Sequence, residues 1–196
     1  YGTNQRASAE LEELFSTRYF DFPKPVSLLN TLITIGSDQS SIVLDFFSGS
    51  GTTAHAVMQL NAEDGGNRKF IMVQLPEETD KDSEAYKAGY ETIADIGRER
   101  IRRAGEKIRK EFAEKYETEL AVINKKIAQG RLDEIEELEE EKAEVEAKLE
   151  HIRNLDTGFR VFKVDTTNIK DVRRHPNEIN PQTIMEFTDN ILDNRT

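Results

Sequence analysis

A carboxylate placed directly before a glycine-rich turn is the feature of this sequence with the clearest chemical use. Asp45 lies within an apolar run, and Gly49 and Gly51 follow it closely. Glycine lets the backbone approach a ligand, and the first amides of the helix that begins near Thr52 lack intrahelical partners and can bind an anionic group. The carboxylate can accept a hydrogen bond from an ammonium group. The pattern therefore predicts a site for a ligand that carries both charges.

Other ligands of glycine turns fit this pattern less well. The phosphate-binding loop of NTPases ends in Gly-Lys-Ser or Gly-Lys-Thr, and residues 48–53 contain no lysine. A nicotinamide dehydrogenase usually holds the ribose with an acid about 20 residues after the turn, where this sequence has Gln74. The amino-acid end of S-adenosylmethionine suits Asp45 better, because its ammonium meets the carboxylate while its carboxylate meets a helix start or a lysine. An ordinary α/β turn that uses glycine for its geometry is the plain alternative.

The segments around the turn predict an α/β unit that positions Asp45. Residues 42–47 are rich in β-forming apolar residues, which is typical of a central strand buried on both faces. Apolar residues recur at helical spacing after residue 52, and residues 70–75 predict a second buried strand. Strand, helix and strand in this order imply parallel pairing with a right-handed crossover. A further helix is expected over 26–35, directly after Pro25.

The second half of the chain predicts two long helices. Apolar residues follow helical spacing over 86–127 and again over 132–152, with a break at 129–131. So short a connection implies an antiparallel helical hairpin, whose apolar stripes either shield the sheet or pair with another subunit; we favour the subunit contact. Alternation over 158–164 predicts a third strand. We therefore expect three parts, at 1–103, 104–155 and 156–196.

Composition limits the classes of function. The chain has 38 acidic and 27 basic residues and a net charge of −11, so a broad basic face for nucleic acid is not expected. It has no cysteine, and its three histidines have no metal-ligand spacing, so we expect no metal site. It has neither an apolar run of membrane-spanning length nor a signal-peptide core, which predicts a cytoplasmic protein without membrane contact. The first residue is Tyr1, which suggests a piece of a longer protein.

Four segments carry a resemblance to a known family. Phe-Pro-Lys-Pro at 22–25, followed by the glycine motif at 45–53, resembles the paired cofactor motifs of amino-group DNA methyltransferases with the circularly permuted beta order of motifs. Segments 70–77 and 156–165 resemble the modification subunit of type III restriction–modification systems. The resemblance implies part of a Rossmann-like methyltransferase sheet, S-adenosylmethionine as cofactor and adenine N6 in double-stranded DNA as substrate. It also implies a homodimer that holds a restriction subunit.

The resemblance assigns the cofactor site residue by residue. Asp45, the glycine turn and Lys24 would hold the methionine part, Gln74 the ribose, and Phe47 would touch the adenine ring. The complete set of implied cofactor-binding residues is Phe22, Lys24, Asp45, Phe46, Phe47, Gly49, Ser50, Gly51, Thr52, Thr53 and Gln74.

No catalytic residue is implied in this chain. The family's catalytic loop pairs two prolines with an aromatic residue, and none of the five prolines here is adjacent to another. In this motif order that loop and the target-recognition domain lie upstream, so we expect the chain alone to transfer no methyl group. A non-enzymatic assembly module with a vestigial turn is the alternative reading. The arginines at 98, 100, 102 and 103 suggest a solvated helix face paired with glutamates, rather than a contact to DNA phosphates.

Overall fold

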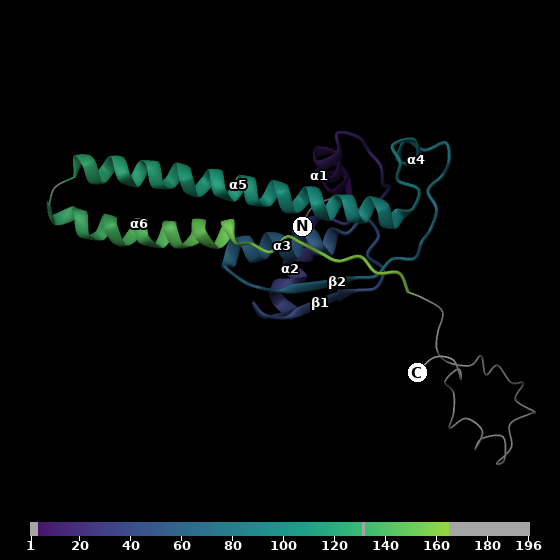
Figure 1. Ribbon diagram of the computed structural model, residues 1–196, viewed down its shortest axis with the longest axis horizontal. Coiled ribbons are helices and arrows are strands. Elements are labelled where there is room, and N and C mark those ends of the chain that lie inside the picture. The colour runs from purple at the N-terminus through teal and green to yellow at the C-terminus, as the bar shows by residue number, and fades with distance from the viewer. Residues whose placement is uncertain (1–3, 131, 165–196) are drawn as a thin grey trace, which may run out of the picture. The chain divides into compact units, whose positions relative to one another are not determined.

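Two short parallel strands and the helix between them carry the glycine turn. In the computed structural model, which describes residues 4–130 and 132–164, β1 (Ile42–Asp45) pairs in parallel with β2 (Lys69–Met72). The register places Val43 opposite Phe70 and Asp45 opposite Met72. Helix α3 (Thr52–Asp64) connects the two strands and lies against them (Figure 1). The predicted strand, turn, helix and strand are therefore all present, with strands of four residues each.

Helix α3 is buried on nearly every side because helices flank it as well as the sheet. Helix α2 (Val26–Gly36) contributes Val26 and Ile33 to a cluster with Val57 and Leu60. On another side, Ala54 and Met58 pack against Ile101 and Ala104 of α5 (Ile93–Gln129). Burial on several faces is expected for a helix in such a central position. The N-terminal end of α3, where the turn lies, is thereby fixed by three neighbouring elements.

The two-stranded sheet is covered on one face only. Val43 and Phe70 point toward the helices and belong to the core. The alternate side chains Ile42, Leu44 and Ile71 are 66%, 56% and 50% exposed. The prediction that this strand is buried on both faces is therefore wrong for the described part of the chain, because the described helices pack on a single side of the sheet.

A short helix and a capped start replace the first part of the predicted long helix. Helix α4 (Glu84–Lys87) ends before Gly89, which has a left-handed φ of +91°. Helix α5 then begins at Ile93, where Thr92 and Asp95 form a capping box. Helix α1 (Asn4–Phe15) packs on this region through Leu11 and Phe15, which share a cluster with Ile96. The continuous helix predicted from residue 86 is thus interrupted over 88–92.

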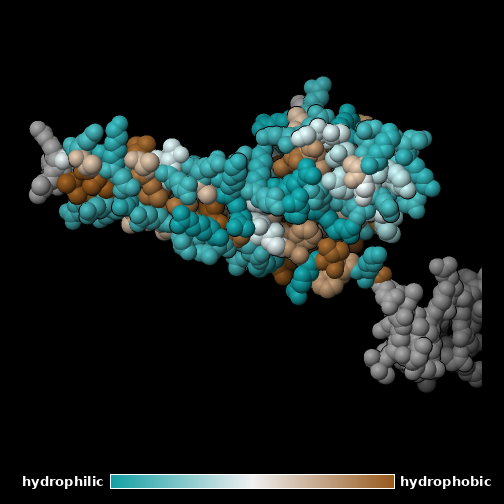
Figure 2. All heavy atoms as spheres, turned by 45° about the horizontal axis from the view of Figure 1, so that its top comes forward, coloured by the Kyte–Doolittle hydropathy of each residue, from teal (hydrophilic) through white to brown (hydrophobic). Residues whose placement is uncertain are grey.

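Helix α6 (Leu132–Arg153) packs beside the C-terminal half of α5 (Figure 1). Tyr116 and Ile123 of α5 are buried with Val145 and Leu149 of α6. Figure 2 shows hydrophobic atoms in patches along this pair of helices, within a mostly hydrophilic surface. The apolar stripes of α5 and α6 therefore pack against each other within one chain. A contact with another subunit through this hairpin stays a prediction.

The prediction of a third strand over 158–164 is wrong. Residues 159–164 belong to a second unit of the chain and have no regular secondary structure. A strand forms only where its amides and carbonyls pair with another strand, and no described residue pairs in this way with 159–164. The rest of the predicted third part, 165–196, lies outside the described residues, and the predicted boundaries at 103 and 155 stay predictions. No helix in the described ranges is long and apolar enough to cross a bilayer.

Candidate cofactor site

Asp45 is held at the carboxyl end of β1 by two hydrogen bonds. Its Oδ2 accepts from the Thr53 hydroxyl at 2.5 Å, and its Oδ1 accepts from the backbone amide of Phe47 at 3.1 Å. One bond reaches the first turn of α3 and the other reaches the loop between strand and helix. The carboxylate is half-buried. Its position is therefore fixed at the end of a parallel strand, where α/β folds commonly bind ligands.

The turn after Asp45 has the conformation that its glycines predict. Gly49 and Gly51 have φ values of +51° and +78°, in the left-handed region where a side chain is strained. The Gly49 amide donates to Oε1 of Gln74 at 2.7 Å, and the Ser48 amide donates to the Val73 carbonyl at 3.1 Å. The segment after β2 therefore braces the turn. The carboxamide oxygen of Gln74 is used in this brace, and its amide nitrogen makes no hydrogen bond within the described residues.

The turn lies directly against the backbone of α5. A Cβ atom added to Gly51 would be 3.1 Å from the Gly97 carbonyl oxygen and 3.3 Å from Ile101 Cγ1. A Cβ atom added to Gly97 would in turn be 3.1 Å from the Gly49 carbonyl oxygen. Such separations are shorter than ordinary van der Waals contacts. Glycine is thus required on both sides of this interface, at Gly51 for conformation and space and at Gly97 for space.

Arg100 of α5 is the residue of this site that sequence reasoning missed. It is 0% exposed, and its Nη1 donates to Ser50 Oγ at 2.9 Å and to Thr52 Oγ1 at 2.6 Å. Its Nε and Nη2 have no hydrogen-bond partner among the described residues. Burial lowers the pKa of Arg100 to about 10, although Glu10 acts in the opposite direction. The arginine remains a cation near neutral pH.

The predicted solvated arginine face is right for some of its members and wrong for Arg100. Arg98 pairs with Asp95, and Arg102 pairs with Glu99 and Glu106. Arg100 instead belongs to a helix face that begins at Gly97, because Arg100, Ile101 and Ala104 follow Gly97 at three, four and seven positions. An arginine inside a stripe of small and apolar residues was the available signal.

The aromatic side chains predicted to contact the cofactor are exposed. Phe46 and Phe47 are 62% and 78% exposed, and their ring centroids are 5.2 Å apart. Phe22 is also exposed and has a left-handed φ of +58°. Single exposed aromatic residues are common, but these belong to the two motifs that flank the site.

Lys24 is exposed between the buried residues Pro23 and Pro25 and forms no ion pair within the described residues. Its loop approaches the turn through Phe20, whose Cζ would be 3.5 Å from a Cβ on Gly49. The structure shows no hydrogen bond between Lys24 and Asp45. The predicted site residues instead form three hydrogen-bonded groups. Asp45 is bonded to Phe47 and Thr53, and Gly49 is bonded to Gln74. Ser50 and Thr52 are both bonded to Arg100.

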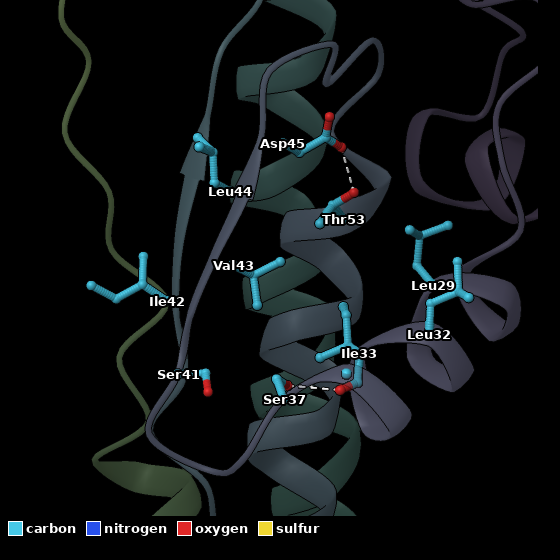
Figure 3. A pocket seen from close by; sticks show the side chains of 11 residues that line it. Leu29, Leu32, Ile33, Ser37, Ser41, Ile42, Val43, Leu44, Asp45 and Thr53 are labelled. Carbon is cyan, nitrogen blue, oxygen red and sulfur yellow. Dashed lines mark hydrogen bonds between the residues drawn. The ribbon is translucent and has the colours of Figure 1, made fainter.

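A groove of about 420 Å³ runs between α2 and β1. Figure 3 shows Asp45 and Thr53 together at one end of it, while Ser37 and Ser41 mark the other end. The walls between are mostly apolar and include Leu29, Ile33 and Val43. The groove follows the length of the strand and touches the glycine turn only through Asp45 and Thr53. We therefore centre the candidate site on the strand end, where the polar groups converge, and not on the groove.

His55 lies one turn into α3 and is buried. Burial, together with the positive charges of Arg100 and Lys107, lowers its pKa from 6.5 to about 3. The imidazole is therefore neutral at physiological pH.

Comparison with known families identifies the segment that carries the site. Residues 2–86 match the family model described as DNA methylase. The match includes the Lys-Pro loop, both strands, the glycine turn and α3. The site-bearing part of the chain is therefore similar to this DNA methylase family.

The individual relatives are DNA-modifying enzymes. The chain is 50% identical to the type III restriction–modification enzyme StyLTI Mod subunit of Salmonella typhimurium over 107 residues, which are 55% of this chain and 16% of that protein. It is 47% identical over 95 residues to the EcoPI Mod subunit of Escherichia phage P1, with 48% and 15% covered. It is 40% identical over 92 residues to the type II methyltransferase M.KpnI of Klebsiella pneumoniae, with 47% and 22% covered.

The resemblance to type III modification subunits is thus confirmed over about half of the chain. The matches span less than a quarter of the length of these relatives.

Proposed function

We propose that this chain is the cofactor-binding portion of an S-adenosylmethionine-dependent DNA methyltransferase, which methylates adenine N6 in a type III restriction–modification system. The observation that carries the proposal is the fixed carboxylate of Asp45 beside the left-handed glycine turn. The family match and the Mod-subunit relatives support it.

The donor set fits the two charges of the methionine end. Each oxygen of Asp45 accepts one hydrogen bond within the chain, which leaves a lone pair on each for an ammonium group. The first amides of α3 and the ammonium of Lys24 would meet the carboxylate. The bound cofactor supplies the methyl group on its sulfonium, and the chain's own residues bind and orient it.

The remaining parts of the cofactor would meet neutral side chains. The exposed ring of Phe47, with Phe46 and Phe22 nearby in the motifs, offers a face for the adenine ring. The free amide nitrogen of Gln74 can donate to a ribose hydroxyl, without the charge of the usual acid. We expect the affinity to be lower than that of a site with an acid at this position.

Larger features of the proposal concern the parent protein. The two strands and α3 would be part of a Rossmann-like sheet, and α5 and α6 would form an antiparallel hairpin. Double-stranded DNA would be bound by other parts of the full-length parent, since this chain is acidic and lacks the Pro-Pro-aromatic loop. The parent would act as a homodimer with a restriction subunit, in the cytoplasm where its DNA substrate lies.

Calorimetric titration with S-adenosylmethionine or its demethylated product tests the proposal. We expect binding that Asp45→Asn weakens by about 10- to 100-fold, because a charge-assisted hydrogen bond is lost while the side-chain volume is kept. Asp38→Asn is the matched control, since Asp38 is an exposed carboxylate before the other end of β1 that bonds Ser40 and Ser41.

Three outcomes would contradict the proposal. Equal affinity of Asp45→Asn and Asp38→Asn for the cofactor would show that Asp45 does not bind it. Heat only with NAD would favour a dehydrogenase. No heat with any nucleotide, together with a dimer in light scattering, would favour the assembly module.

A further inference from the structure

Arg100 is unusual among buried arginines because no carboxylate in the described part of the chain accepts a hydrogen bond from it. Its hydrogen-bond partners in the described residues are two neutral hydroxyls, those of Ser50 and Thr52. Glu10 contributes electrostatic attraction, but its Oε2 accepts from the Val26 amide and its Oε1 pairs with Arg6. A buried guanidinium with two unpartnered nitrogens costs folding stability. Stability alone therefore does not account for an arginine at this position.

The hydrogen bonds of Arg100 converge on the residues that flank Gly51. Ser50 precedes the left-handed glycine and Thr52 is the first residue of α3, and the same Nη1 holds both hydroxyls. Both side chains are themselves buried. Together with the close contact between Gly97 and Gly51, these two hydrogen bonds form a clamp that fixes the turn.

The charge of Arg100 also has a defined electrical effect. The N-terminal end of a helix carries a partial positive charge, and a cation behind it is unfavourable for the folded state in isolation. The same combination raises the positive potential at the first amides of α3, which is where an anionic group would bind. Burial keeps this charge from being screened by solvent.

We propose that Arg100 is a positioning residue for the cofactor, which fixes the glycine turn through the hydroxyls of Ser50 and Thr52 at a cost to folding stability. The inference rests on the proposed function and goes beyond it by adding a residue of α5 to a site otherwise built from the strands and α3. Arg100 does not touch the cofactor, because its side chain is completely buried.

The first test compares Arg100→Met with Arg102→Met in the full chain. Arg102 lies on the same helix, is half-exposed and pairs with glutamates, so it controls for loss of one positive charge. We expect Arg100→Met to melt at the same temperature as the unsubstituted chain or higher. Its Kd for the demethylated cofactor should rise about 10-fold. Arg102→Met should change the Kd less than about 2-fold.

A structural role for Arg100 predicts the opposite pattern. A large fall in melting temperature with an unchanged Kd for the folded chain would overturn the proposal. An unchanged Kd at an unchanged melting temperature would overturn it as well.

A double-mutant cycle tests the route of the effect. If Arg100 acts through the two hydroxyls, Arg100→Met should weaken binding less than about 2-fold further in the Ser50→Ala, Thr52→Ala background. Full additivity of the two changes would show that Arg100 does not act through Ser50 and Thr52 and would overturn the proposal.

Amide hydrogen exchange in the absence of any ligand separates this inference from the proposed function. The amides of Gly51 and His55 donate to the carbonyls of Ser48 and Gly51, and we expect both to exchange about 10-fold faster in Arg100→Met and at an unchanged rate in Arg102→Met, because the clamp has been removed. If the parent chain binds no cofactor, the proposed function fails, and these exchange rates still decide whether Arg100 positions the turn. Equal exchange in both variants would overturn the inference.

Discussion

The two ends of α3 are built from the same residue types, but the arginines beside them have different hydrogen-bond partners. Each end has a glycine in the left-handed region, Gly51 before the helix and Gly65 after it, and each has a buried arginine beside it. At the C-terminal end, Arg68 donates from Nη1 and Nη2 to the two carboxylate oxygens of Asp64, at 3.0 and 2.9 Å. At the N-terminal end, Arg100 donates to hydroxyls alone.

This difference indicates that Arg68 is needed for folding, whereas folding stability does not explain Arg100. Arg68 is paired bidentately, and it lies at the helix end where a cation is favourable. Burial alone would raise the pKa of Asp64, but the hydrogen bonds from Arg68 and the Gly66 amide outweigh it and hold the pKa below its usual value. Arg100 has none of these compensations. Where a buried charge has no hydrogen-bonded counter-charge among the described residues, a ligand site is a better explanation than stability.

The largest effect on stability should come from Arg68→Met. Arg68→Met removes two charge-assisted hydrogen bonds to Asp64, whose side chain is partly exposed, and we expect a loss of about 3 kcal/mol in the free energy of unfolding. Cofactor affinity of the folded chain should be unchanged. Urea denaturation and calorimetry measure the two quantities, with Lys69→Met as a control for an exposed neighbouring cation. A loss as small as that of the control would remove the contrast between the two ends.

The glycines give a second, smaller contrast. Gly51→Ala combines backbone strain with the close contact to Gly97, so we expect a loss of about 2 kcal/mol. Gly65→Ala has the same type of strain, but no atom lies within 4 Å of the added Cβ, and we expect about 1 kcal/mol. Equal losses in urea denaturation would mean that the turn can move away from α5, which would contradict the close packing at Gly97.

The smallest expected effect is a pH dependence of folding stability that comes from His55, near the N-terminal end of α3. The folded-state pKa of His55 is depressed to about 3 from 6.5, so the unfolded chain binds more protons between these values and stability falls as the pH falls. From about pH 6.5 to about pH 5.5 His55 should contribute a loss of about 1 kcal/mol. His55→Leu should lack this part of the slope in urea denaturation, and Gly65→Ala should keep it. Parallel slopes for the parent chain and His55→Leu would show that the histidine is accessible to protons.

Local signals in the sequence were sufficient for the part of the site made by one continuous segment. Asp45, the two glycines and the start of α3 lie within eleven residues, from 45 to 55, and their conformation follows from residue type. The contribution of α5 was not predictable in this way. Arg100 lies 50 residues from Ser50, and its burial depends on how two helices pack. Composition suggested a charged, solvated face, which is the usual fate of an arginine cluster.

The other errors have similarly physical causes. The helix predicted from residue 86 fails because Thr92 and Asp95 satisfy the amides of a new helix start, which a periodicity of apolar residues does not reveal. The strand predicted over 158–164 has the right alternation, but alternation does not provide a partner strand. Both cases show that apolar spacing identifies candidate elements while hydrogen-bond partners decide them.

The capping box at Thr92 has a consequence for how this region tolerates changes in length. It fixes the residue at which α5 begins, and Gly97 and Arg100 follow at five and eight positions. One residue inserted between Thr92 and Gly97 would rotate the rest of the helix by about 100°. Gly97 and Arg100 would then point away from the glycine turn. Insertions before Thr92 would leave this angular register intact. Homologous chains should therefore vary in length over 78–91 and keep a constant length from 92 to 100.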